Sequence, residues 1–236
     1  MPNWELKHFA NAAAVADQCA ADCLALLASP SARKCIAISG GRIAKGFFIS
    51  VARVAKERGQ SLAHVHFFWA DERCVPPDHA ESNYRSAAEQ LFTPLDLPPQ
   101  NLHRIRGEVE PEGAAREAEA ELRRFTPTNT AGQPVLDLVL LGMGEDGHVA
   151  SLFPSESEDV MSSQAVYRSV TASKPPPRRI TLGYAAIAAA REVWVLASGA
   201  GKEEALRESL LPSGRAPLAR VLRERERTRI FTDLAA

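Results

Sequence analysis

A glycine-rich loop that contains a carboxylate and an imidazole directly follows the apolar run at residues 136–141. Residues 142–154 read Gly-Met-Gly-Glu-Asp-Gly-His-Val-Ala-Ser-Leu-Phe-Pro. Histidine titrates near neutral pH, so His148 is a candidate general base or general acid. Glycine lets the backbone approach a ligand closely, and ligands of α/β proteins bind at the ends of strands. The loop therefore predicts proton-transfer chemistry at the end of a buried strand.

The glycines of this loop also match the spacing of the dinucleotide-binding fingerprint, at Gly142, Gly144 and Gly147. That fingerprint opens a helix, and an acidic residue about 20 positions later binds the ribose. Pro154 interrupts any such helix, and no strand that ends in Asp or Glu follows at the required distance. The sequence therefore argues against a nicotinamide cofactor. A plain glycine turn with an incidental histidine is the simplest alternative, and only evidence from the other loops can exclude it.

Two further glycine loops have the composition of anion-binding sites. In Ser39-Gly-Gly-Arg42, Gly40 and Gly41 free backbone N–H groups to point at an anion beside the positive end of a predicted helix. In Ser198-Gly-Ala-Gly-Lys202, the lysine is predicted in the first turn of a helix, where its charge opposes the helix dipole. A bound anion would remove that conflict. Each loop taken alone is also compatible with an ordinary strand-to-helix turn.

A charged segment, Asp71-Glu-Arg73, follows the predicted strand at residues 65–69, in a stretch from 70 to 81 that we expect to be a polar loop. Neighbouring side chains of an extended chain point to opposite sides. One carboxylate can therefore face a site while the other pairs with Arg73 or a neighbour. The commoner fate of such a segment is a solvated turn. The pattern leaves both readings open.

These loops need a scaffold, and the sequence pattern predicts alternating helices and strands. Helices are predicted at residues 8–28, 43–59, 82–92, 112–125, 184–191, 202–210 and 216–223. Short apolar runs typical of buried strands occupy residues 35–39, 65–69, 136–141, 180–182, 192–197 and 229–232. This alternation indicates an α/β fold, a mostly parallel sheet with helices on both faces. With 236 residues, the chain suits one domain, 1–236, with room for a small inserted lobe.

The composition limits the classes of protein and partner. Hydrophobic residues make up 45% of the chain and charged residues 24%, and 28 basic against 29 acidic residues leave a net charge of −1. This balance predicts no nucleic-acid partner and no membrane surface. No apolar run is long enough to cross a bilayer, and no signal peptide is recognisable. The four cysteines lack metal-site spacing, so we expect no metal and a reducing cytoplasm; they are Cys19, Cys23, Cys35 and Cys74.

Five segments taken together, in this order, resemble the 6-phosphogluconolactonase family, part of a wider group of phosphosugar enzymes that includes the glucosamine-6-phosphate deaminases. They spread over nearly the whole chain. Besides residues 142–154, they are Ser39-Gly-Gly41, Asp71-Glu-Arg-Cys-Val-Pro76 with Ser82-Asn83, Arg179-Ile-Thr-Leu182 and Gly199-Ala-Gly-Lys202. The resemblance implies a Rossmann-like, doubly wound sheet, no metal and no cofactor. It also implies a phosphosugar lactone, 6-phospho-D-glucono-1,5-lactone, as the small-molecule substrate.

The resemblance implies roles for individual residues. Hydrolysis of the cyclic ester needs an activated water, which we assign to His148 as base and, for the leaving ring oxygen, as acid. Asp146 would orient the imidazole or bind a sugar hydroxyl, and backbone N–H groups of residues 142–147 are candidates for binding the oxyanion. The phosphate is expected among Gly40, Gly41, Arg42, Arg179 and Lys202, and further substrate contacts at Asp71, Arg73, Gly144 and Gly147.

One loop departs from the family pattern. The family usually continues Ser-Gly-Gly-Ser-Thr-Pro, whereas this chain reads Arg42-Ile43-Ala44 after its two glycines. Two hydroxyl donors for a phosphate are therefore absent. The guanidinium of Arg42 can bind phosphate in their place or point into solvent. Asp71 is equally open: it either takes a substrate proton, like the matching residue of the deaminases, or only orders its loop.

Two other functions compete with a lactonase. An amino-sugar-phosphate deaminase/isomerase would carry a glutamate shortly after the histidine, in a Phe-Asn-Glu-Pro sequence, but this chain has Phe153 there. A non-catalytic phosphosugar-binding protein on the same fold would have no need of Asp146 and His148 as an acid–base pair. We therefore predict a lactone hydrolase.

Overall fold

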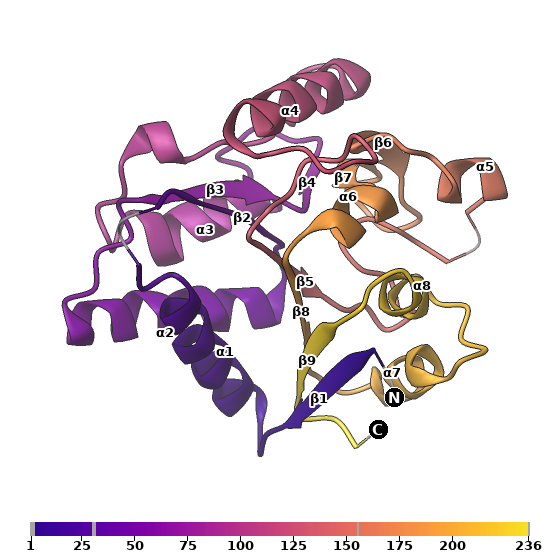
Figure 1. The fold of residues 1–236 in the computed structure, drawn as a ribbon, viewed down its shortest axis with the longest axis horizontal. Helices are drawn as coiled ribbons and strands as arrows, with labels where there is room; N and C mark the ends of the chain where they lie inside the picture. The colour runs from indigo at the N-terminus through magenta and orange to yellow at the C-terminus, as the bar shows by residue number, and fades with distance from the viewer. Residues whose placement is uncertain (1–2, 30–31, 155, 236) are drawn as a thin grey trace.

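Six parallel strands form the central sheet of the protein, in the order β1-β9-β8-β5-β2-β3 (Figure 1). The structure is a computed structural model and describes residues 3–29, 32–154 and 156–235. The strands of this sheet are β1 (Trp4–His8), β2 (Lys34–Ile38), β3 (Val65–Trp69), β5 (Leu138–Gly142), β8 (Glu192–Ala197) and β9 (Thr228–Thr232). All neighbouring strands run parallel, which confirms the predicted kind of sheet.

Helices cover both faces of this sheet, so the doubly wound α/β architecture is also confirmed (Figure 1). The long helices α1 and α2 pack against each other on one face, and α7 and α8 lie together on the other. The α-helices are α1 (Ala12–Leu26), α2 (Arg42–Arg58), α3 (Asn83–Ala87), α4 (Pro111–Phe125), α5 (Glu158–Met161), α6 (Tyr184–Ala189), α7 (Glu203–Leu210) and α8 (Pro217–Arg223); a short 3-10 helix, η2, spans Pro99–Asn101.

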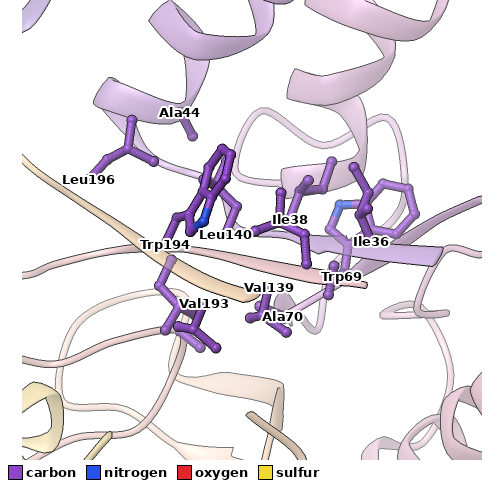
Figure 2. Close-up of a cluster of buried hydrophobic side chains, with 14 of the residues drawn as sticks. Ile36, Ile38, Ala44, Trp69, Ala70, Val139, Leu140, Val193, Trp194 and Leu196 are labelled. Atoms are coloured by element: carbon purple, nitrogen blue, oxygen red, sulfur yellow. The ribbon is translucent and has the colours of Figure 1, made fainter. Parts of the chain in front are cut away.

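The interior strands β5 and β8 are buried along almost their whole length. Strands covered on both faces are rich in Val, Ile and Leu and lose the alternation of polar and apolar residues, which is why apolar runs predicted them. Figure 2 shows Leu140 and Trp194 on the same side of the strands as Ala44 of α2. Their chain neighbours Val139 and Val193 point to the other side. The core of the protein therefore fills both faces of the sheet.

Two predicted helices have different bounds in the structure. The helix predicted at residues 8–28 begins only at Ala12, because the side chain of Asn11 caps it by accepting the backbone N–H of Ala14 at 3.0 Å. The residues before it form β1, an edge strand whose partly buried residues give no apolar run. The helix predicted at residues 82–92 is α3 followed by a π-helical turn, η1 (Ala88–Phe92).

A smaller antiparallel sheet has the order β4-β7-β6; of its strands only β7 matches a predicted run, at residues 180–182. Its strands are β4 (Asp71–Arg73), β6 (Tyr167–Thr171) and β7 (Arg178–Leu182). The polar loop predicted at residues 70–81 is wrong at its start, where β4 forms. Charged residues hide this strand in the sequence, and it exists because β7 pairs with it, Asp71 opposite Thr181 and Arg73 opposite Arg179. Helix α4 packs on this sheet, at the top of Figure 1.

The fold brings the candidate loops to one edge of the large sheet. The strands β8, β5, β2 and β3 are consecutive and parallel in the sheet, so their carboxyl ends all lie at this edge. This edge is where open α/β sheets bind ligands. Across the described ranges, no helix is both long enough and apolar enough to cross a membrane.

Candidate active site

A cavity of about 200 Å³ opens at this edge of the sheet. It collects residues from every predicted loop and from β7. Its lining is formed by Ser39, Gly40, Gly41, Arg42, Ile43, Asp71, Arg73, Asn83, Gly142, Met143, Gly144, His148, Ala150, Arg179 and Lys202. Of the predicted site residues, Asp146 and Gly147 lie outside this lining. The structure therefore brings the other predicted residues together around one space.

His148 and Asp146 form a hydrogen-bonded pair on the histidine loop, residues 142–154. Nδ1 of His148 lies 2.5 Å from Oδ1 of Asp146, which also accepts the backbone N–H of His148 at 3.2 Å. Burial raises the pKa of Asp146, but the hydrogen bond and charge of His148 outweigh it, so the pKa is lowered. An ionised Asp146 accepts a hydrogen bond from the Nδ1–H group of His148. The other ring nitrogen, Nε2, then carries the free lone pair. Within the described chain, Nε2 forms no hydrogen bond.

Gly144 supports the imidazole by a contact that leaves no room for a side chain. A Cβ atom on Gly144 would lie 2.1 Å from Cε1 and Nδ1 of His148 and 2.9 Å from Oδ1 of Asp146. The N–H of Gly144 donates to the His148 carbonyl at 2.9 Å, and the N–H of Gly147 donates to the Gly144 carbonyl at 3.1 Å. Both N–H groups are used inside the turn. Neither of these two N–H groups is therefore free to bind an oxyanion, and the other N–H groups of residues 142–147 stay candidates.

Gly147 is predicted to contact the substrate, but in the structure it packs against the start of α8. Its φ is +75°, in the left-handed region that favours glycine, and a Cβ atom there would lie 2.6 Å from Cβ of Ala216. Its carbonyl accepts the N–H of Leu218 at 3.1 Å. Gly147 thus lets the histidine loop approach the start of α8 closely, behind the cavity.

A tight turn after His148 connects the histidine loop to the small sheet. Ala150 has a φ of 49°, which non-glycine residues rarely adopt. The backbone N–H of Ser151 donates to Oγ1 of Thr181 at 3.1 Å, and its hydroxyl donates to Oδ2 of Asp71 at 2.8 Å. Strained backbone of this kind persists only where the surrounding contacts enforce it. The turn is therefore held from both β4 and β7.

The two carboxylates of β4 point to opposite sides of the strand, as an extended chain requires. Asp71 lines the cavity, and Nδ2 of Asn83 donates to its carbonyl at 2.9 Å and lies 3.4 Å from its Oδ1. Glu72 faces the other way and is only 2% exposed. Together with Ser151, Asn83 leaves Asp71 held at both of its carboxylate oxygens.

Glu72 organises the far wall of the site through backbone groups rather than through a cation. Its oxygens accept hydrogen bonds from the backbone N–H groups of Arg73, Asn83 and Tyr84 and from the hydroxyl of Ser82. Burial raises the pKa of Glu72, and the three backbone hydrogen bonds oppose that shift. Glu72 therefore ties β4 to the start of α3 and holds Asn83 in place.

Four cationic side chains line the cavity as two neighbouring pairs. Burial lowers the pKa of Lys202, and the charge of Arg42 lowers it further. Burial, followed by the charge of Arg73, likewise lowers the pKa of Arg179. Lys202 is the N-cap residue of α7, one position before the first turn in which it is predicted. Each pair thus places two positive charges close together on the cavity, an arrangement that favours an anionic ligand.

Few carboxylates neutralise these cations. Within the described ranges, Arg73 has an ion pair, with Glu81 at 3.2 Å, whereas Arg42, Arg179 and Lys202 have none. Arg179 is 6% exposed and donates to two backbone carbonyls, of Pro176 at 3.1 Å and of Lys174 at 3.3 Å. In the described chain, Nε of Arg73 is buried without a hydrogen-bond partner. This donor is available to a polar ligand, because buried polar groups are normally paired.

The N-terminus of α2 also opens on the cavity. Gly41 is its N-cap residue, with a φ of 104°, and no side chain of the described residues caps the helix. Its first backbone N–H groups are therefore open to an anion, which the helix dipole also favours. Oγ of Ser39 is buried beside this loop without a partner among the residues that the structure describes. Gly40 has no room for a side chain, because a Cβ atom would lie 1.8 Å from Oδ1 of Asn83.

Four polar residues of the site are absent from the predicted set: Ser39, Asn83, Ser151 and Thr181. Hydroxyl and amide side chains are common in turns and carry no spacing signal of their own. All four lie inside segments that resemble the family, and this position is the signal that points to them. Ser151 and Thr181 meet only because β7 pairs with β4.

Two further findings bound the site. In the part of the chain that the structure describes, no three His, Cys, Asp or Glu side chains form a cluster that could bind a metal. A larger groove, of about 910 Å³, lies beyond the histidine loop, and Asp146 and Phe153 are part of its lining. Asp146 therefore contacts His148 from outside the smaller cavity.

Comparisons with known proteins show the family to which the chain belongs. The family model described as glucosamine-6-phosphate isomerases/6-phosphogluconolactonase matches residues 8–230. The chloroplastic 6-phosphogluconolactonase 3 of Arabidopsis thaliana is 39% identical over 163 residues, which are 66% of this chain and 50% of that protein. The 6-phosphogluconolactonase of Streptomyces coelicolor is 37% identical over 210 residues, 85% of this chain and 80% of that one.

The fold is shared with a solved structure as well. The 6-phosphogluconolactonase of Trypanosoma brucei is 28% identical, with a TM-score of 0.85 over 98% of this chain and 97% of the other. The chain spans about half the length of the plant relatives that it matches, 50% for Arabidopsis and 55% for rice. The family match runs from the end of β1 into β9 and includes every segment that lines the cavity. The chain belongs to the glucosamine-6-phosphate isomerase/6-phosphogluconolactonase family.

Proposed function

We propose that this protein hydrolyses 6-phospho-D-glucono-1,5-lactone to 6-phospho-D-gluconate, the lactonase step of the oxidative pentose phosphate pathway. The observation that carries the proposal is the unpartnered Nε2 of His148, in the described chain, on a cavity with four cations. A phosphorylated ester needs a base near its carbonyl and positive charge near its phosphate. The names of the Arabidopsis and Streptomyces relatives support the same activity.

His148 acts as general base and then as general acid. Nε2 takes a proton from water while the water oxygen attacks C1, and negative charge forms on the former carbonyl oxygen. The bond from C1 to the ring oxygen then breaks, and the imidazolium returns the proton to that oxygen. Asp146 holds the imidazole in the tautomer that leaves Nε2 unprotonated, and it stabilises the charged form.

The two cationic pairs take different parts of the substrate. The phosphate binds at the open N-terminus of α2, between Arg42 and Lys202. Arg179 lies on the histidine side, since the ring of Phe153 is 5.6 Å from its guanidinium and 4.9 Å from the imidazole. With Arg73 beside it, Arg179 stabilises the charge that forms at C1, a role that the N–H groups of Gly144 and Gly147 do not fill because both are used inside the turn.

Asp71 orders the site rather than taking a substrate proton. Its Oδ2 accepts the hydroxyl of Ser151 at 2.8 Å, and its Oδ1 lies near the amide of Asn83. A carboxylate held in this way positions the turn after His148. Phe153 stands where a deaminase would carry its glutamate, so ring-opening chemistry on an amino sugar has no acid at that position.

The proposal extends to the setting of the enzyme. Its partner is a small phosphosugar lactone, without nucleic acid or membrane, and residues 1–236 act as one domain in which the small antiparallel sheet is a lobe. All four cysteines are free thiols, which suits the reducing cytoplasm that we propose as its location.

A lactonase assay tests the activity. The substrate is freshly generated 6-phosphogluconolactone, and the rate of spontaneous hydrolysis is subtracted because this ester opens on its own. We expect a rate that rises with protein concentration and no release of ammonia from glucosamine 6-phosphate. A rate equal to the background would contradict the proposal. Ammonia release would favour the deaminase, and binding of the phosphosugar without turnover would favour a binding protein.

A further inference from the structure

The ring of Phe153 contacts both the imidazole of His148 and the guanidinium of Arg179. The ring centroids of His148 and Phe153 are 4.9 Å apart at 44°, and Cζ of Arg179 is 5.6 Å from the Phe153 centroid. We infer that Phe153 is a positioning residue that fixes the base and the cation of the reaction centre relative to each other. This inference rests on the proposed roles of His148 and Arg179.

The backbone, and not only the ring contacts, fixes where Phe153 lies. The N–H of Leu152 donates to the Val149 carbonyl at 2.9 Å, and Ala150 closes this turn with its left-handed φ of 49°. Ser151, directly before Leu152, is bonded to Asp71 and Thr181 through its hydroxyl and its N–H. These contacts fix the backbone of residues 149–152, and this backbone places the ring of Phe153 against the imidazole.

The hydrogen bonds of Arg179 do not neutralise its positive charge. In the described chain it donates to two carbonyls and has no carboxylate partner, although it is 6% exposed and burial lowers its pKa. The negative face of an aromatic ring attracts a guanidinium, and the attraction is larger where water is excluded. The Phe153 ring stabilises the charged form of Arg179 without competing for the anion that Arg179 is to bind.

The same ring completes the surroundings of the imidazole. Asp146 holds Nδ1 of His148, and Gly144 lies against the edge formed by Nδ1 and Cε1. Phe153 adds a third contact and also lines the larger groove, whereas His148 and Arg179 line the smaller cavity. The ring therefore separates the reacting groups from the open groove. Its loss would let the imidazole turn and let water reach it from that side.

The test compares Phe153→Leu with a matched control, Phe125→Leu. Phe125 is also partly buried and also contacts a histidine and arginines, His103 at 4.2 Å and Arg33 at 5.4 Å, but it lies on α4, away from the cavity. Both variants are assayed with 6-phosphogluconolactone for kcat and KM. Phe153→Tyr, which keeps the ring, and Phe153→Met, which keeps the volume, are measured beside them, with thermal unfolding to show that each variant is folded.

We expect kcat/KM of Phe153→Leu to fall on the order of tenfold or more, because a displaced base and a weakened cation both contribute. The loss should appear mainly in kcat, with a smaller change in KM, because the reaction centre and not the phosphate site is disturbed. Phe153→Tyr should restore the wild-type values, Phe153→Met should behave like Phe153→Leu, and Phe125→Leu should keep wild-type kinetics.

Wild-type kcat and KM in folded Phe153→Leu or Phe153→Met would overturn the inference. So would equal losses in Phe153→Leu and Phe125→Leu, because they would indicate a general packing effect. His148→Ala in the same assay separates the two levels of the proposal. If His148→Ala is inactive while Phe153→Leu is normal, only the positioning role fails; if His148→Ala is fully active, the proposed base itself fails.

Discussion

Two histidine–carboxylate pairs in this protein share a local geometry and differ in the partner of Nε2 and in the exposure of the imidazole. Nδ1 of His148 is 2.5 Å from Asp146, and Nδ1 of His103 is 2.9 Å from Glu121. Nε2 of His148 is without a hydrogen-bond partner in the described chain, whereas Nε2 of His103 lies 2.8 Å from Nδ1 of His66. The side chain of His148 is 24% exposed and that of His103 is 5% exposed.

The second pair is a structural link rather than a reactive one. It joins β3, through His66, to α4, through Glu121, and the rings of Phe68 and Phe125 pack on His103 at 4.4 and 4.2 Å. Burial lowers the pKa of His103 even though Glu121 opposes that shift. The comparison shows that a histidine–carboxylate pair is suited to catalysis when its second nitrogen faces room for water and substrate among unpaired cations.

The largest expected effect comes from changing the carboxylate of each pair into an amide. In Asp146→Asn the amide would donate to Nδ1, so the proton of the imidazole moves to Nε2 and the base is lost. We expect kcat to fall by about 10²–10⁴-fold. Glu121→Gln should leave kcat unchanged and lower the free energy of unfolding by about 0.5–1.5 kcal/mol, because the hydrogen bond from buried His103 then goes to a neutral and partly exposed acceptor. Similar kcat losses in both variants would remove the distinction between the pairs.

Gly144→Ala sharpens the comparison by moving His148 without removing it. A methyl group would collide with the imidazole, at 2.1 Å from two ring atoms. Displacement of a catalytic group by about 1 Å costs about 10²-fold in rate, so we expect a loss of that size in kcat. Gly113→Ala on α4, where the nearest atom would be 3.4 Å away, is the control and should keep full activity. Normal turnover in Gly144→Ala would show that the observed orientation of His148 is not the reactive one.

Lys202→Ala tests whether the cations, and not the histidine alone, define the site. Loss of a charged hydrogen bond to phosphate should raise KM by about 10- to 100-fold with a smaller change in kcat. Lys56→Ala, an exposed lysine in the last turn of α2, serves as control. An unchanged KM would contradict the assignment of Lys202 to the phosphate.

The last prediction concerns stability at the second pair rather than activity. Burial, followed by the charges of His103 and Arg33, lowers the pKa of His66 from 6.5 to about 4. The unfolded chain therefore binds a proton at His66 from about pH 6.5 downward, and the folded protein resists it until about pH 4. The free energy of unfolding should fall with pH across this window and level off below it. Urea unfolding between pH 4 and 7 should show a shallower slope for His66→Gln; the same slope as wild type would refute this.

The sequence predicts the first pair better than the second, for a physical reason. Asp146 and His148 are two residues apart in a glycine loop after an apolar run, so spacing reveals them. His66, His103 and Glu121 lie in three separate segments, and only the pairing of residues near Leu102 with β3 brings them together. The sheet, the main helices and the meeting of the candidate loops follow from periodicity and strand order.

Features that depend on tertiary contacts are not predictable in this way. The strand β4 carries only charged residues and exists because β7 pairs with it. The use of the N–H groups of Gly144 and Gly147 inside the turn, and the place of Gly147 against Ala216, depend on backbone conformation that glycine spacing alone does not specify. The ring of Phe153 reaches His148 through a left-handed turn at Ala150, a residue that ordinarily avoids that conformation.

The most direct test of the central claim replaces His148 or His103 by alanine. It compares the kcat values of the two variants with 6-phosphogluconolactone after subtraction of spontaneous hydrolysis. We predict that His148→Ala lowers kcat by about 10²–10⁴-fold and changes KM much less, because proton transfer and not phosphosugar binding is lost. His103→Ala, assayed at a temperature at which it is folded, should keep the wild-type kcat. A wild-type kcat in His148→Ala would contradict the account.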